Sequence, residues 1–156
     1  MENEIAVTPV NIGSTAIFLS VADFSILFPA FTFFLDCFHL AEYDLETAKA
    51  MLDTKRYLYV GFMCHQTIKK GLKAVIAKAG QFPPKIHNLI ELSKKALLYD
   101  SFTDEQKDFI VGLNPLNIES RYPSYVEKIS AILTETKCKE VLFDTRELLK
   151  WIETKL

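Results

Sequence analysis

The 156-residue chain has few residues of the kinds that interrupt helices or cross-link small domains. Its five glycines and six prolines lie mostly between segments with a regular hydrophobic period. Its three cysteines, Cys37, Cys64 and Cys138, lie far apart and form no CxxC pair. This argues against a disulfide framework and favours buried free thiols in a reducing compartment. At 156 residues the chain is long enough for one domain, and 49% hydrophobic residues are enough for a substantial core. The scarcity of glycine and proline within the periodic segments favours an all-helical fold.

The chain also lacks an excess of charge of either sign. It has 18 Lys and Arg residues against 20 Asp and Glu residues, and its net charge is -2. Proteins that bind nucleic acid tightly and nonspecifically usually have a basic surface. The near-neutral net charge therefore argues against such binding, although a local basic face is compatible with it. The sequence contains no Walker loop, no HExxH, no GxSxG and no metal-ligand spacing. We therefore expect no metal site and no cofactor.

Charge is scarcest in the first third of the chain. Between residues 5 and 35 the only charged residue is Asp23, and residues 16–35 are long enough to cross a bilayer. Asp23 and Pro29 interrupt this run, no basic flank would orient it, and its acidic start is unlike a secretory signal. We expect residues 1–35 to form an apolar extension that packs on the domain or acts as a dimerisation arm. A membrane segment and a poorly ordered extension are the alternatives, and we favour a cytoplasmic protein without stable membrane insertion.

Hydrophobic spacing predicts helices over the remaining chain. Residues 56–79 are apolar nearly all round in their first half, which is typical of a central helix with neighbours on several sides. Gly80 follows as a natural C-cap. In the next predicted helix, residues 85–99, we expect Leu97 to face the core.

The full set of predicted helices covers residues 36–54, 56–79 and 85–99, two short helices that begin at the capping boxes Thr103 to Gln106 and Ser124 to Glu127, and residues 138–154. No strand pattern longer than a few residues is present. We predict an all-α fold, an up-down bundle of four to five helices over residues 36–156, with the apolar extension in front of it.

A polar stripe on the central helix is the first candidate site. His65, Lys69 and Lys73 are spaced by four, and Gln66 and Lys70 lie beside them. Clustered lysines hold phosphate groups of nucleotides or RNA in many proteins, although such a stripe is also typical of a solvated helix face.

Two further candidates lie away from this stripe. His87 follows two prolines near a predicted helix start, where the helix dipole disfavours the imidazolium, so a neutral ring would serve as a general base or make a structural hydrogen bond. Arg121 lies beside Tyr122 and Pro123. Its planar guanidinium would reach a phosphate or tether the loop, and the Tyr122 ring would stack or pack.

Residues 41–74, the segment PPKIHNLIEL at 83–92 and Arg121-Tyr122-Pro123 together resemble the HEPN family of small helical domains. Stand-alone members have a His or Gln, a Gln, a Glu-Lys pair and a Leu-Lys-Ala run on one helix. This chain is similar at His65-Gln66, at Lys70 and at Leu72-Lys73-Ala74, and it departs from the pattern at Lys69, where the family has Glu. The resemblance covers residues 36–156.

The resemblance implies a protein that accompanies a nucleotidyltransferase, cleaves RNA as a toxin, or is an inactive scaffold. RNA-cleaving members have an Arg, about four to six residues, and then a His, which moves protons while the Arg steadies the phosphate. Here Arg56 is nine positions before His65, outside that gap, so the motif is missing.

We therefore predict a non-catalytic HEPN-type module that forms a homodimer and binds a nucleotide, RNA or a nucleotidyltransferase partner, as one half of a toxin–antitoxin-like pair. The expected ligand-binding residues are His65, Lys70, Lys73, His87, Arg121 and Tyr122. One alternative is a metal-independent RNA-cleaving toxin with a non-standard site built from His87, Arg121 and Lys73. Another is a membrane-attached interaction protein, which rests only on the apolar N-terminal run.

Overall fold

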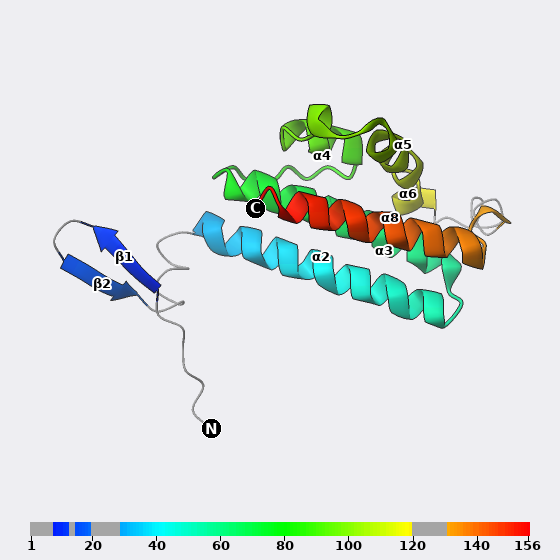
Figure 1. Cartoon of the computed structure of the whole chain (residues 1–156), viewed down its shortest axis with the longest axis horizontal. Coiled ribbons are helices and arrows are strands. Elements are labelled where there is room, and N and C mark those ends of the chain that lie inside the picture. The colour runs from blue at the N-terminus through cyan, green and yellow to red at the C-terminus, as the bar shows by residue number, and fades with distance from the viewer. Residues whose placement is uncertain (1–7, 13–14, 20–28, 120–130) are drawn as a thin grey trace, which may run out of the picture.

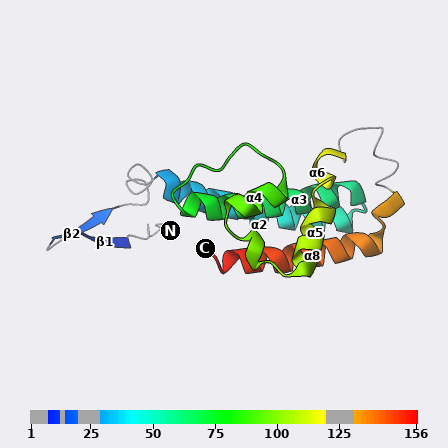
Figure 2. The ribbon, with the colours of Figure 1, turned by 90° about the horizontal axis from the view of Figure 1, so that it is seen from above.

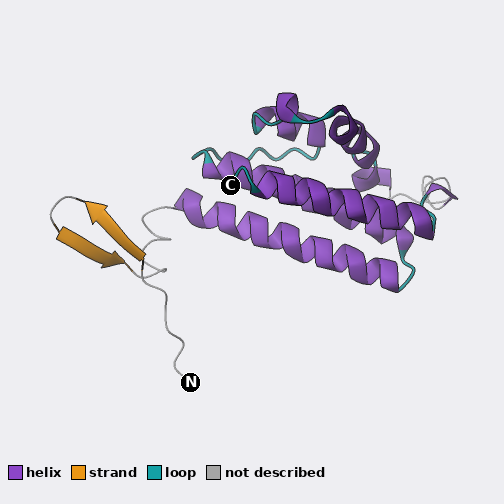
Figure 3. Cartoon of the chain, in the orientation of Figure 1, coloured by secondary structure: helices purple, strands orange, loops and turns teal. Residues whose placement is uncertain are grey.

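The computed structural model describes residues 8–12, 15–19, 29–119 and 131–156, and the domain that it shows is all-α, as predicted (Figures 1 and 3). The elements are β1 (Thr8–Ile12), β2 (Thr15–Leu19), α2 (Pro29–Asp53), α3 (Tyr57–Lys78), α4 (Leu89–Lys95), the 3-10 helix η1 (Tyr99–Ser101), α5 (Asp104–Leu113), α6 (Leu116–Glu119) and α8 (Glu135–Glu153).

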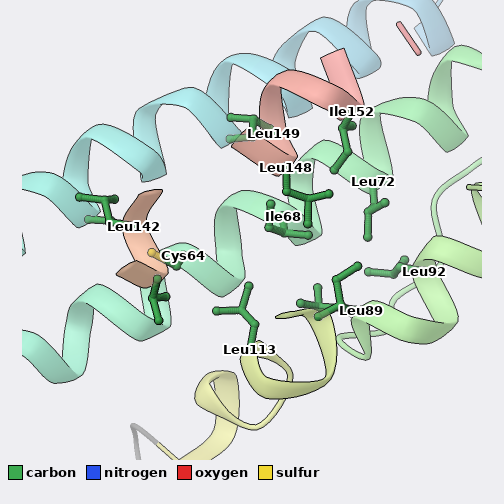
Figure 4. Packing of buried hydrophobic residues seen from close by; sticks show 14 of the residues in the cluster. Cys64, Ile68, Leu72, Leu89, Leu92, Leu113, Leu142, Leu148, Leu149 and Ile152 are labelled. Carbon is green, nitrogen blue, oxygen red and sulfur yellow. The ribbon is translucent and has the colours of Figure 1, made fainter. Parts of the chain in front are cut away.

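Helix α3 is the central element of the domain. The long helices α2, α3 and α8 lie side by side, and the shorter α4, α5 and α6 cover one side of α3 (Figures 1 and 2). Ile68 and Leu72 of α3 are fully buried between Leu148 of α8 and Leu89 of α4 (Figure 4). These contacts confirm the prediction that residues 56–79 form a central helix. The physical reason is that an α-helix that is apolar nearly all round needs neighbours on several sides.

Two helices begin at residues other than those predicted, because a side chain caps each of them at a different position. The helix expected from residue 85 begins at Leu89, because the Asn88 side chain accepts hydrogen bonds from the N–H groups of Ile90 and Glu91. The helix expected from Cys138 begins three residues earlier, because Thr134 caps it by accepting from the Lys137 N–H.

Two other helix boundaries correspond to strong local signals. Thr103 and Gln106 form the predicted capping box of α5. Gly80 takes a left-handed φ of 77° after α3, as expected of a C-cap glycine. The second predicted capping box, Ser124 with Glu127, lies outside the described residues.

Leu97 does not face the core, and this prediction was wrong. Helix α4 ends at Lys95, and Leu97 adopts a φ of 58° in the turn that follows. The N–H of Leu97 bonds to the Lys94 carbonyl and the N–H of Leu98 bonds to the Ser93 carbonyl, which is the hydrogen-bond pattern of a helix C-cap. The turn directs the Leu97 side chain into solvent, where it is 86% exposed.

The predicted N-terminal extension contains elements that the sequence pattern did not reveal. Strands β1 and β2 pair antiparallel, with Val10 opposite Ile17, and only two residues separate them. Helix α2 begins at Pro29 rather than at the expected residue 36, and proline is favoured at the first position of a helix. Among the described residues, no helix is both long and apolar enough to cross a membrane.

Candidate binding site on helix α3

The lysines of the α3 stripe contact different neighbours. Lys70 forms an ion pair with Asp44 of α2, with 2.6 Å between Nζ and Oδ2. Lys69 donates instead to the Gln66 side chain, whose Nε2 donates to Asn117 Oδ1 of α6 at 3.1 Å. Successive residues of an α-helix are about 100° apart, so Lys69 and Lys70 point toward different neighbours. The predicted single basic stripe is therefore divided between α2 and α6.

Lys73 differs from these two lysines, because it forms no ion pair with any residue that the structure describes. Its side chain is partly exposed and lies near Cys37 of α2. Burial raises the pKa of the Cys37 thiol above its ordinary value, and the positive charge of Lys73 opposes that shift. An anion that approached Lys73 would therefore displace no ion-pair partner among the described residues.

His65 is not part of the exposed stripe, contrary to the prediction from its spacing. Its side chain is fully buried, and Nε2 lies 3.1 Å from the backbone carbonyl oxygen of His87. A carbonyl oxygen only accepts, so His65 must donate from a protonated Nε2. His65 therefore links α3 to the loop before α4, across 22 positions of sequence.

His87 lies in that loop, and its side chain is exposed. It precedes Asn88, the N-cap of α4, and therefore lies outside the helix. The helix dipole acts most strongly within the first turn, so its effect on His87 is weaker than the sequence suggested. Asn114 supports the same region by accepting a hydrogen bond from the Leu89 N–H at 2.9 Å. The contact between the two histidines is therefore a hydrogen bond from the His65 ring to the backbone carbonyl of His87, and the His87 ring takes no part in it.

Asp44 and Asn117 contact the lysine stripe, and we did not predict either from the sequence. Both are buried polar residues. Asp44 lies between Ala41 and Ala48 on the buried side of α2, and a carboxylate on an apolar face needs a partner. That position is a signal that could have identified Asp44. Asn117 had no comparable signal, because its partner Gln66 is 51 positions away.

The remaining predicted ligand-binding residues, Arg121 and Tyr122, lie outside the described residues. Within the part of the chain that the structure describes, no group of three or more His, Cys, Asp or Glu residues could hold a metal ion. Burial raises the pKa of the Cys64 thiol to about 12 and that of Cys138 to about 11, so neither is a reactive thiolate near neutral pH.

Exposed apolar side chains flank the Asp44–Lys70 ion pair. Tyr43 is next to Asp44 and is 67% exposed, and Leu40, one turn earlier on α2, is 49% exposed. Tyr59, toward the other end of α3, is also exposed. Amphipathic tyrosines are common at protein interfaces, and we call Leu40, Tyr43, Tyr59 and Lys73 the α2–α3 face.

The family model of the HEPN domain matches residues 35–155. The chain therefore belongs to the HEPN domain family. Among solved structures, the crystal structure of TT1696 from Thermus thermophilus is similar to this chain, with a TM-score of 0.69 and 20% sequence identity, over 79% of this chain and 98% of that chain. At this identity the similarity establishes a shared fold. No curated protein matches the chain.

Proposed function

We propose that this HEPN protein is a non-catalytic binding module that holds the phosphate groups of a nucleotide at Lys73 on the α2–α3 face. One observation carries the proposal. His65 is hydrogen-bonded to the His87 carbonyl and Lys70 is paired with Asp44, while Lys73 has no ion pair among the described residues. A buried histidine that holds a backbone carbonyl cannot move a proton on a surface-bound substrate. A partly exposed ammonium group, by contrast, makes charge-assisted hydrogen bonds to phosphate oxygens.

The α2–α3 face also supports the homodimer and the partner proposed from the family resemblance. Leu40 and Tyr43 of α2 add exposed apolar surface near the Asp44–Lys70 pair, and Tyr59 adds more about four turns of α3 before Lys73. Two copies that meet on this face would bring two Lys73 side chains near one site. A nucleotidyltransferase-like partner would supply the nucleotide, as in a toxin–antitoxin-like pair.

Calorimetric titration of the full chain with ATP tests the nucleotide proposal. We expect Lys73→Gln to weaken binding by about tenfold or more, because it removes a charge-assisted contact. Lys78→Gln is the matched control on the same helix, since Lys78 is exposed near its end, and it should leave the affinity within about twofold. The proposal fails if neither ATP nor other nucleotides bind and no complex with a minimal nucleotidyltransferase appears on size exclusion.

Incubation with cellular RNA in EDTA tests the claim that the module is not catalytic. We expect the RNA to remain intact. If the wild-type chain cleaves RNA, and if His87→Ala and Arg121→Ala both abolish the cleavage, then the chain is a metal-independent nuclease with a non-standard site and our proposal is wrong.

A further inference from the structure

A groove separates α5 from α8, away from the α2–α3 face. Its two parts are hollows of about 490 Å³ and about 460 Å³. Glu105, Phe109 and Asp144 line both hollows, so the two are continuous along the helices. We call this feature the α5–α8 groove.

The floor of the groove is apolar. Leu113, Leu116 and Val141 line the hollow toward the start of α8, and Leu148 and Trp151 line the other. Phe109 lies between the two sets and is only partly buried, and Ile132, at the far end, is exposed. An open apolar trough of this kind accepts the apolar face of an amphipathic helix in many complexes.

The described residues at the rim of the groove include three carboxylates. Within the described part of the chain, Glu105, Asp108 and Asp144 form no ion pair. Among the described residues, the two lysines that also line the groove are already paired at 3.0 Å, Lys137 with Glu140 and Lys150 with Glu147. Hydrogen bonds from its own backbone N–H and from Thr103 hold the pKa of Glu105 below its ordinary value, which keeps this carboxylate charged.

We propose that the α5–α8 groove binds an amphipathic helix of a partner protein, with leucine-like side chains on one face and lysines or arginines at its edges. The apolar floor would bury the first set, and the acidic rim would pair with the second. The rim repels phosphate, so this site is distinct from the nucleotide site proposed at Lys73 and does not depend on it.

Charge also argues against a second copy of this chain as the occupant. In a symmetric dimer the same patch faces itself, so the acidic rims of two copies would be brought together. Like charges at an interface are unfavourable. A basic partner would instead form ion pairs with the rim carboxylates.

Fluorescence anisotropy with a labelled Leu/Lys peptide tests the proposal on the full chain. The probe has leucines at helical spacing, and its control is a peptide of the same composition with the leucine stripe scrambled. We expect the striped peptide to bind at least about tenfold more tightly than the scrambled one, because only the striped peptide presents a continuous apolar face.

Gly112 allows the groove to be blocked without disturbing the fold. It lines the groove, and a Cβ added there meets no atom of the described residues within 4 Å. Gly112→Phe should therefore weaken binding of the striped peptide by about tenfold or more. Val111→Phe, at the neighbouring exposed position that does not line the groove, is the matched control and should change affinity by less than about twofold.

Charge reversal tests the rim separately. The double variant Asp108→Lys, Asp144→Lys should weaken binding by about tenfold, while Asp100→Lys, on the exposed η1 turn outside the groove, should have little effect. Thermal melting followed by circular dichroism confirms that each variant is folded.

Three outcomes would overturn the proposal: equal binding of the striped and scrambled peptides, unchanged affinity in Gly112→Phe, or conversion of a dimer to a monomer by Gly112→Phe in light scattering. The last result would identify a second copy as the occupant. ATP titration of Gly112→Phe separates the two proposals, because blocking the groove leaves Lys73 untouched.

Discussion

Leu97 combines an unfavourable backbone conformation with an exposed apolar side chain. The left-handed conformation costs a residue with a Cβ about 1–2 kcal/mol, and a glycine at this helix C-cap would avoid the cost. The side chain is 86% exposed, so it gains little from burial. Leu97 is therefore a residue whose replacement should increase stability.

We expect Leu97→Gly to raise the free energy of unfolding by about 0.5–1 kcal/mol, after allowing for the greater freedom of glycine in the unfolded chain. Urea denaturation measures the change. Leu97→Ala is the matched control, because it removes the same exposed side chain but keeps the Cβ, and it should be close to wild type. A Leu97→Gly protein no more stable than Leu97→Ala would show that the backbone at Leu97 is not strained.

At the scale of elements, the start of α4 depends on one side chain. Asn88 Oδ1 accepts from the N–H groups of Ile90 and Glu91 at 3.0 and 3.1 Å. These two donors have no partner within the helix, since the first N–H groups of any α-helix lack one. The same cap places His87 just outside the helix, where its carbonyl oxygen meets His65.

Asn88→Ala should lower the free energy of unfolding by about 1 kcal/mol, because both N–H groups lose their acceptor. Asn88→Ser retains a capping oxygen and should lose much less. Chemical denaturation of the two variants decides the point, and equal losses would mean that the cap is not the stabilising feature.

For the molecule as a whole, the arrangement of the helices determines which surfaces remain open to a partner. Helix α3 is covered by α8 and by the layer of α4, α5 and α6 (Figures 1 and 2). Leu40 and Tyr43 of the adjacent α2 remain exposed. Our proposed homodimer would bury this apolar surface, since burial of apolar area is the main favourable term in association.

The proposed dimer predicts a mass near twice the chain mass of 17.8 kDa in light scattering. The double variant Leu40→Glu, Tyr43→Glu should be monomeric, because it would bury unpaired charges at the interface. Phe143→Glu, at a similarly exposed apolar position on α8, should remain dimeric. A monomeric wild-type chain, or an identical mass for all three proteins, would contradict a dimer on the α2–α3 face.

Local patterns were sufficient to predict the central helix, the Thr103–Gln106 capping box and the glycine cap after α3, since each depends on residues a few positions apart. They failed for His65, whose spacing matched an exposed stripe although its ring is buried against a loop 22 positions away. They also failed for Leu97, where α4 ended before the apolar period did.

The sequence by itself determined that this chain is all-α with lysines along its central helix, because helical period and caps are encoded in neighbouring residues. Its motifs, by their resemblance to known members, indicated the HEPN family. Only the tertiary structure decided that Asp44 holds Lys70, that Asn117 holds Gln66 and that Lys73 has no ion pair among the described residues. Those partners come from α2 and α6, and helix packing alone brings them to α3. It likewise creates the α5–α8 groove, which no single segment of the sequence contains.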